Sequence, residues 1–166
     1  MARIRRLGFG SYAELLAGRS GERGWRLRWI DSAEGLYTAL GTVREPIARL
    51  WFWGHAQSNL WLYLDHAQDG TPLRPPDDAV VTVASIAAHS GLLPAFLEGG
   101  THCFVGCRTA PFAGEWARVF GVVAHGTSGK TDFESIDRTG GAPALAPGTT
   151  WLPFRPSVRR PAQSAR

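Results

Sequence analysis

Two short apolar runs constrain the fold of this chain more than any other feature of its sequence. Ile47–Trp53 has the sequence IARLWFW, and residues 101–105 have the sequence THCFV. Apolar side chains at nearly consecutive positions are typical of a strand that is buried on both faces, as in a parallel sheet covered by helices. We therefore expect both runs to be strands inside one sheet.

Helix signals separate these strands. Ser32 is a predicted N-cap for a helix that ends at Gly41. Pro111 opens a second helix over residues 112–120, whose apolar positions form one wide stripe, and Gly121 ends it. Pro94 is expected to open a short third helix that stops at Gly99 and Gly100.

The remaining segments are weaker signals. Residues 80–88 are apolar and short, so they fit a strand or a helix equally well. The proline-rich segment 70–78 and the Gly/Pro/Ala-rich segment 140–150 are predicted loops. Further strands are expected at 25–30, 59–65 and from 122 to 124, and residues 151–154 are expected to return to the body of the fold.

Strands that alternate with helices predict an α/β protein, and we expect a three-layer sandwich around a largely parallel sheet. The length of 166 residues suits one ordinary domain. We therefore expect a single domain over residues 1–156, followed by a basic tail over 157–166 that lacks ordered structure.

Composition excludes several classes of protein. The chain is 44% apolar and 19% charged, which argues against intrinsic disorder. Its net charge of +4 comes largely from arginines near the two ends, and no basic stripe interleaved with aromatic residues indicates nucleic-acid binding. No run approaches the ~18–20 apolar residues of a membrane span, and no signal-peptide core is found near the start. A cytoplasmic protein without membrane contact is therefore expected.

Both cysteines, Cys103 and Cys107, belong to the second apolar run or its end. Four strand steps of ~3.3 Å separate their Cα atoms by about 13 Å, which is beyond disulfide reach. Each cysteine is therefore a buried thiol, a metal ligand or a nucleophile.

His55 and Cys107 each follow one of the two apolar runs after a single glycine. The carboxyl ends of neighbouring parallel strands lie at one edge of a sheet, where ligands bind. An imidazole within reach of a thiol can generate the nucleophilic thiolate. The pattern therefore predicts a catalytic dyad of His55 and Cys107, with Cys103 in the core.

The blocks ARLWFWGHA and THCFVGCRTA resemble the two catalytic blocks of the caspase-like cysteine peptidases, and most closely those of the bacterial CHAT domains. In that superfamily one apolar strand ends in a His-Gly motif, and a later one ends in a small residue followed by the nucleophilic cysteine. The resemblance covers residues 25–135. Here Cys107 is followed by Arg108, Thr109 and Ala110, which is similar to the CHAT pattern.

The resemblance implies a peptidase without a cofactor, acting on a protein or peptide substrate. His55 would be the base and Cys107 the nucleophile, and the backbone of Gly106 and Cys107 would form the oxyanion hole. Asp31 would line the substrate pocket, although an aspartate at that position also suits a helix cap. Ala56 stands where the family usually has glycine, so the alternative is a catalytically silent member that serves as a protein-interaction module.

Three rival patterns carry less weight. Residues 124–131 (AHGTSGKT) match a relaxed phosphate-binding loop, but no helical stripe follows them, so a glycine turn between strands is the preferred interpretation. The five histidines and two cysteines show no metal-ligand spacing, and we expect no metal site. Asp65 and His66 are adjacent, but nothing in the sequence connects them to Cys107.

Overall fold

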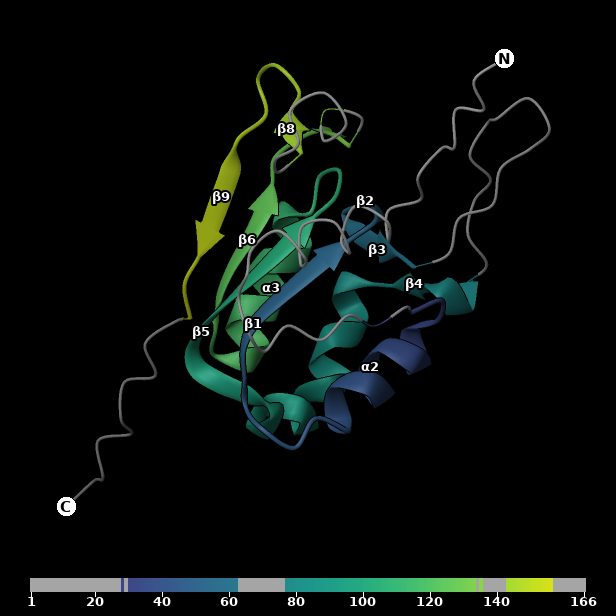
Figure 1. Ribbon diagram of the computed structural model, residues 1–166, viewed down its shortest axis with the longest axis vertical. Coiled ribbons are helices and arrows are strands. Elements are labelled where there is room, and N and C mark those ends of the chain that lie inside the picture. The colour runs from purple at the N-terminus through teal and green to yellow at the C-terminus, as the bar shows by residue number, and fades with distance from the viewer. Residues whose placement is uncertain (1–27, 29, 63–76, 134, 136–142, 157–166) are drawn as a thin grey trace, which may run out of the picture.

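The computed structural model describes residues 28, 30–62, 77–133, 135 and 143–156. Its centre is a four-stranded sheet with the order β1-β5-β6-β9 (Figure 1). Strands β1, β5 and β6 are parallel, and β9 is antiparallel to β6. Their bounds are Ile47–Trp53, Phe96–Val105, Val123–Thr127 and Trp151–Phe154. The predicted mixed α/β class with a mostly parallel sheet is therefore confirmed.

Strand β5 starts earlier than the sequence predicted. Ile47 lies opposite Phe96, but Arg49 lies opposite Thr101, so β5 carries extra residues between these two pairs. Gly99 has a φ of 71° within this irregularity, a backbone conformation that glycine adopts without strain. The helix predicted to start at Pro94 and stop at Gly99 is therefore wrong, because a 3₁₀ segment ends at Ala95 and the bulged strand begins at Phe96.

Helices α2 and α3 and the longer of the two described 3₁₀ segments accompany the sheet. Helix α2 is Ala33–Gly41, and the Ser32 hydroxyl accepts the N–H of Gly35 as an N-cap. Helix α3 is Ala110–Phe120, with Gly121 in the left-handed conformation at its end. The 3₁₀ segment η2 is Val83–Ala95 and packs between α3 and α2. The first two helices agree with the predicted capping signals.

Two small antiparallel sheets flank the carboxyl end of the central sheet. One joins β2 (His55–Gln57), β3 (Asn59–Trp61) and β4 (Val80–Val81), and it is preceded at β4 by the short turn η1 (Asp77–Ala79). The other joins β7 (Thr131–Asp132) and β8 (Ala144–Leu145). Residues 80–88 thus contain both a strand and a helical turn, which explains why their pattern was ambiguous.

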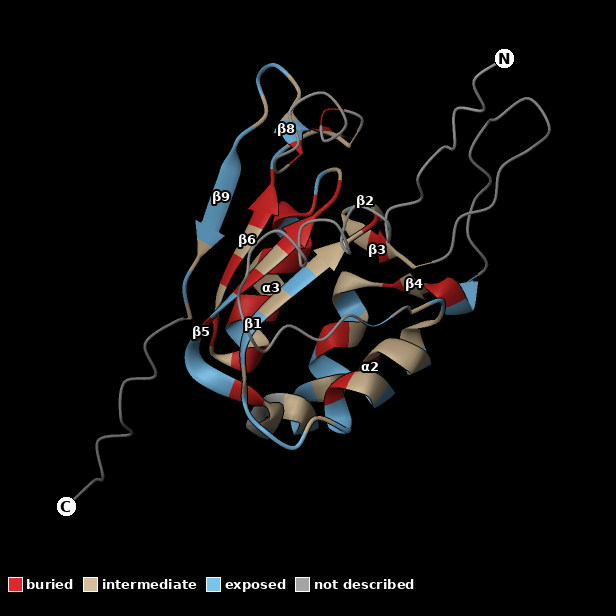
Figure 2. Ribbon diagram, viewed as in Figure 1, coloured by how far each residue is buried: buried red, intermediate tan, exposed pale blue. Residues whose placement is uncertain are grey.

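The core lies between the sheet and α3 (Figure 2). Trp116 of α3 is completely buried and packs against aromatic rings from two elements, among them Phe96 and Phe104 of β5. Its indole Nε1 donates a hydrogen bond of 2.9 Å to Nδ1 of His102, which is also completely buried. His102 is therefore a neutral core residue whose proton resides on Nε2.

Some predictions lie partly or wholly outside the described residues. Of the strand predicted at 25–30, Arg28 and Ile30 are described and neither is in a strand. Residues 63–65 of the third predicted strand, the pair Asp65 and His66, and the tail 157–166 lie outside the described residues. In Figure 1 the face of the sheet opposite α3 has no described helix over it, so the third layer of the sandwich stays a prediction. Within the described residues, no helix has the length and apolar character needed to span a membrane.

Candidate active site

His55 and Cys107 leave adjacent parallel strands at the same edge of the sheet. The last register pair of β1 and β5 is Trp53 with Val105. His55 is two residues beyond Trp53, and Cys107 is two residues beyond Val105. Both residues therefore lie the same number of positions beyond the last paired residues of the two strands. Both side chains are half-buried. The predicted convergence of the two carboxyl ends on one sheet edge is therefore present in the backbone.

Hydrogen bonds hold the two loops together beyond the strands. The Gly54 N–H donates to the Val105 carbonyl at 3.2 Å, and the Ser58 N–H donates to the Arg108 carbonyl at 3.2 Å. Among the described residues, Ser58 and Arg108 are the non-glycine residues with positive φ, 63° and 55°. Such backbone strain is found preferentially at functional sites.

Gly106 is required by the close approach of these loops. A Cβ atom at this position would lie 2.7 Å from the Gly54 carbonyl oxygen and 3.0 Å from the Ala56 Cβ. The first obstacle is backbone, so it cannot rotate away as a side chain would. The close approach of the loop that carries His55 therefore explains why a glycine precedes Cys107.

We expect Gly106→Ala to destabilise the protein by about 1–3 kcal/mol, the usual cost of overpacking a filled interior. Chemical denaturation measures this change. Gly91→Ala is the matched control, because a Cβ there meets nothing within 4 Å and the backbone needs no positive φ. Equal stability changes in the two variants would contradict the predicted steric conflict.

Cys107 lies against the segment that follows β6. The Thr131 N–H donates to Cys107 Sγ at 3.4 Å, and the sulfur lies 4.0 Å from the Thr131 carbonyl oxygen. The neighbouring Arg108 N–H donates to the Gly129 carbonyl at 2.7 Å. The sulfur thus lies against both backbone groups of Thr131, and the backbone of Arg108 is held to the same segment.

The same segment reaches across to β1. Phe133 packs edge-on against Trp53, with 6.2 Å between ring centroids, and Trp51 continues the aromatic row at 6.1 Å from Trp53. Three parts of the chain therefore form the candidate site: the end of β1, the end of β5 and the segment around β7. Sequence analysis did not identify Thr127 and Thr131 as site residues, although both donate hydrogen bonds to the Gly106 carbonyl.

Cys103 lies in a different environment from Cys107. It is in the middle of β5, in register with His125 of β6, and burial raises the pKa of its thiol. The raised pKa keeps Cys103 protonated and unreactive near neutral pH. Cys103 is half-buried and lies outside the cluster of buried residues that forms the core, so its predicted place in the core is wrong.

Three other predictions concern the surroundings of the site. Asp31 is exposed and directly precedes the N-cap Ser32, so its role in substrate binding stays a prediction. The AHGTSGKT segment runs from β6 through a turn into β7, which is the preferred glycine turn between strands. A phosphate-binding loop needs a helix directly behind it, and here that position is occupied by strand β7. Within the described ranges, no three His, Cys, Asp or Glu side chains cluster as a metal site.

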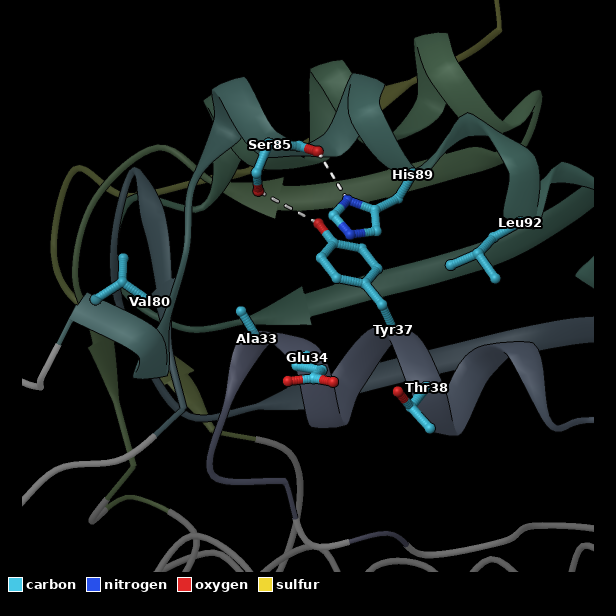
Figure 3. Close-up of a pocket in the computed structure, with 8 residues that line it drawn as sticks. All are labelled: Ala33, Glu34, Tyr37, Thr38, Val80, Ser85, His89 and Leu92. Atoms are coloured by element: carbon cyan, nitrogen blue, oxygen red, sulfur yellow. Dashed lines mark hydrogen bonds between the residues drawn. The ribbon is translucent and has the colours of Figure 1, made fainter.

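A hollow lies between α2 and η2, on helices that do not carry His55 or Cys107 (Figure 3). Tyr37 stacks on His89 with ring centroids 3.4 Å apart. His89 Nδ1 bonds to the Ser85 backbone carbonyl at 3.0 Å, whereas the Ser85 hydroxyl bonds to the Thr82 carbonyl at 2.8 Å. The imidazole therefore does not activate Ser85 as a nucleophile. Burial raises the pKa of Tyr37, against a smaller opposing effect of its Ser85 hydrogen bond, so the Tyr37 phenol joins the two helices as a neutral group.

No protein-family model, characterised protein or solved structure was found to match this chain. Membership of the caspase-like superfamily or its CHAT branch therefore stays a prediction based on the two sequence blocks.

Proposed function

We propose that this protein is a caspase-like cysteine peptidase in which His55 activates Cys107 to attack a peptide carbonyl. The observation that carries the proposal is the placement of the two residues in step beyond the last register pair of adjacent parallel strands. This arrangement brings a base and a nucleophile from distant parts of the sequence to one sheet edge.

The environment of Cys107 supports the same chemistry. Its sulfur accepts the Thr131 N–H, and it lies three residues before the first residue of α3, near the positive end of the helix dipole. Both features place partial positive charge near the sulfur that would react. In the proposed reaction the thiolate forms a thioester with the acyl part of the substrate, the C–N bond breaks, and the amine leaves with a proton from His55. Water then hydrolyses the thioester.

Ala56 is compatible with this proposal. It is buried on β2, and its methyl group faces the space that a Gly106 side chain would occupy. The glycine before the cysteine thus provides the room that the alanine after the histidine needs. We further infer that the chain forms one caspase-like domain with a third layer over the open sheet face, and that Asp31 contributes to its substrate pocket.

Alkylation with iodoacetamide at neutral pH tests the dyad without knowledge of a substrate. Peptide mass spectrometry gives separate rates for the two cysteines, and we expect Cys107 to react about tenfold faster than Cys103, because the thiolate is the reactive species. His55→Ala should remove most of this difference. His125→Ala is the matched control, since His125 is in register with Cys103 on the neighbouring strand.

Equal alkylation rates of the two cysteines, or a Cys107 rate unaffected by His55→Ala, would exclude the dyad. That result would favour the alternative function, a catalytically silent fold that acts as a protein-interaction module.

A further inference from the structure

The carbonyl group of Gly106 is held by two buried threonine hydroxyls. Thr131 Oγ1 donates to it at 2.9 Å, and Thr127 Oγ1 donates to it as well. Thr127 is completely buried and Thr131 is 8% exposed. A carbonyl oxygen has two lone pairs, so this one accepts a hydrogen bond at each. A peptide carbonyl held by two side-chain hydroxyls from another segment is fixed in direction.

The direction of this carbonyl determines where the Cys107 N–H points. The Gly106 carbonyl and the Cys107 N–H belong to one planar trans peptide, so they point to opposite sides. The carbonyl faces Thr127 of β6 and Thr131 of β7. The Cys107 N–H therefore faces the end of β1, where His55 lies. Among the described residues, none accepts a hydrogen bond from this amide.

Thr131 also contacts the nucleophile itself. Its N–H donates to Cys107 Sγ, and its hydroxyl donates to the carbonyl of Gly106, the residue before Cys107. One residue thus orients both the sulfur and the peptide that precedes it.

We propose that Thr127 and Thr131 are positioning residues that orient the Cys107 N–H as the oxyanion-hole donor. This inference rests on the proposed peptidase function, and it assigns Gly106 a part in the site through its carbonyl. When the thiolate attacks a substrate carbonyl, the developing oxyanion would accept the Cys107 N–H. A donor fixed in advance stabilises that charge without reorganising during the reaction.

Two reactions of the same thiol separate this role from a structural one. With p-nitrophenyl acetate, the Cys107 sulfur attacks the ester carbonyl, a thioester forms, p-nitrophenolate leaves, and the thiol proton passes to His55. This step develops an oxyanion. With iodoacetamide, the sulfur displaces iodide from a saturated carbon, and no oxyanion forms. The ratio of the two rates therefore reports on the oxyanion hole and not on the thiolate.

We expect Thr131→Val to lower the acylation rate about tenfold and to change the alkylation rate less than twofold, in a Cys103→Ser background that leaves a single thiol. Valine retains the backbone N–H that faces the sulfur. The double variant Thr127→Val/Thr131→Val should approach the ~10²-fold effect of losing an oxyanion donor. Thr131→Ser keeps the hydroxyl and should restore the acylation rate, and Thr101→Val, an exposed site on β5, should change neither rate.

The possible failures are distinguishable. A parallel fall of both rates in Thr131→Val, or an unchanged ratio in the double variant, overturns the positioning role and leaves the dyad in place. A parent protein in which acylation of Cys107 does not depend on His55 overturns both the proposed function and this inference.

Discussion

Cys107→Ala is expected to lower peptide hydrolysis by at least about a thousandfold, because removing the nucleophile of a covalent mechanism leaves only the contribution of binding and of the oxyanion hole. His55→Ala should cost about 10²–10⁴-fold, the usual range for a general acid–base group. Digestion of a peptide library by the protein and its variants, followed by mass spectrometry, measures both losses.

The matched control for this experiment is Cys103→Ala. Cys103 is half-buried within β5, and burial raises its thiol pKa, so its removal should leave the cleavage rate within about twofold. Thermal unfolding should show that Cys107→Ala remains folded, since the side chain is only half-buried. Retained cleavage by folded Cys107→Ala would contradict the proposed nucleophile.

Local sequence signals were sufficient to predict strand β1, which precedes His55, and helix α3, which follows Cys107. Strand β1 has the predicted bounds Ile47–Trp53, because an apolar run ends there before Gly54. Its predicted burial on both faces is wrong, because β1 is an edge strand of the four-stranded sheet and none of its residues is buried. Helix α3 begins two residues before the predicted start and ends at the predicted Phe120, because proline and glycine mark its ends. The parallel pairing of β1 with β5 followed from the strongly apolar character of the two runs, which is typical of parallel strands.

The elements that sequence analysis missed depend on contacts between distant residues. The early start of β5 needs a bulge at Gly99, whose positive φ only the strand pairing reveals. The hydroxyl donors of the Gly106 carbonyl come from Thr127 and Thr131, more than twenty residues further along the chain. Their segment matches a relaxed phosphate-binding loop in sequence, and no periodic or motif signal connects a threonine after one strand with a carbonyl after another.

The role of His102 could not be predicted from the sequence either, because that role depends on burial. Nothing in the sequence distinguishes it from the other four histidines. In the fold it lies under α3, with Nδ1 accepting from Trp116 and Nε2 buried without a hydrogen-bond partner among the described residues. Burial lowers the pKa of His102 to about 4, against a weaker opposing effect of the Ile47 backbone. Its charged form is therefore excluded from the core over most of the pH range in which an unfolded histidine titrates.

The stability of the protein is consequently expected to fall on acidification. In the unfolded chain His102 has its ordinary pKa of about 6.5, so below that pH the unfolded state binds a proton that the folded state does not. The free energy of unfolding should decrease as the pH falls from about 6.5. The loss should level off below about pH 4, where folded His102 is also protonated. This shift corresponds to about 3 kcal/mol of lost stability.

His102→Asn isolates this contribution. The asparagine carbonyl can replace Nδ1 as the acceptor of the Trp116 N–H, and asparagine does not titrate in this range. Urea unfolding of both proteins at several pH values between 4 and 7.5 gives the comparison. The carboxylates and other histidines are common to both, so the difference between the two stability curves reports on residue 102. We expect the wild type to lose about 3 kcal/mol more than His102→Asn across this window, whatever the variant costs at neutral pH. Parallel curves would mean that His102 takes up its proton in the folded protein as readily as in the unfolded one, and the neutral Trp116–His102 pair would then not be the acid-sensitive element of this core.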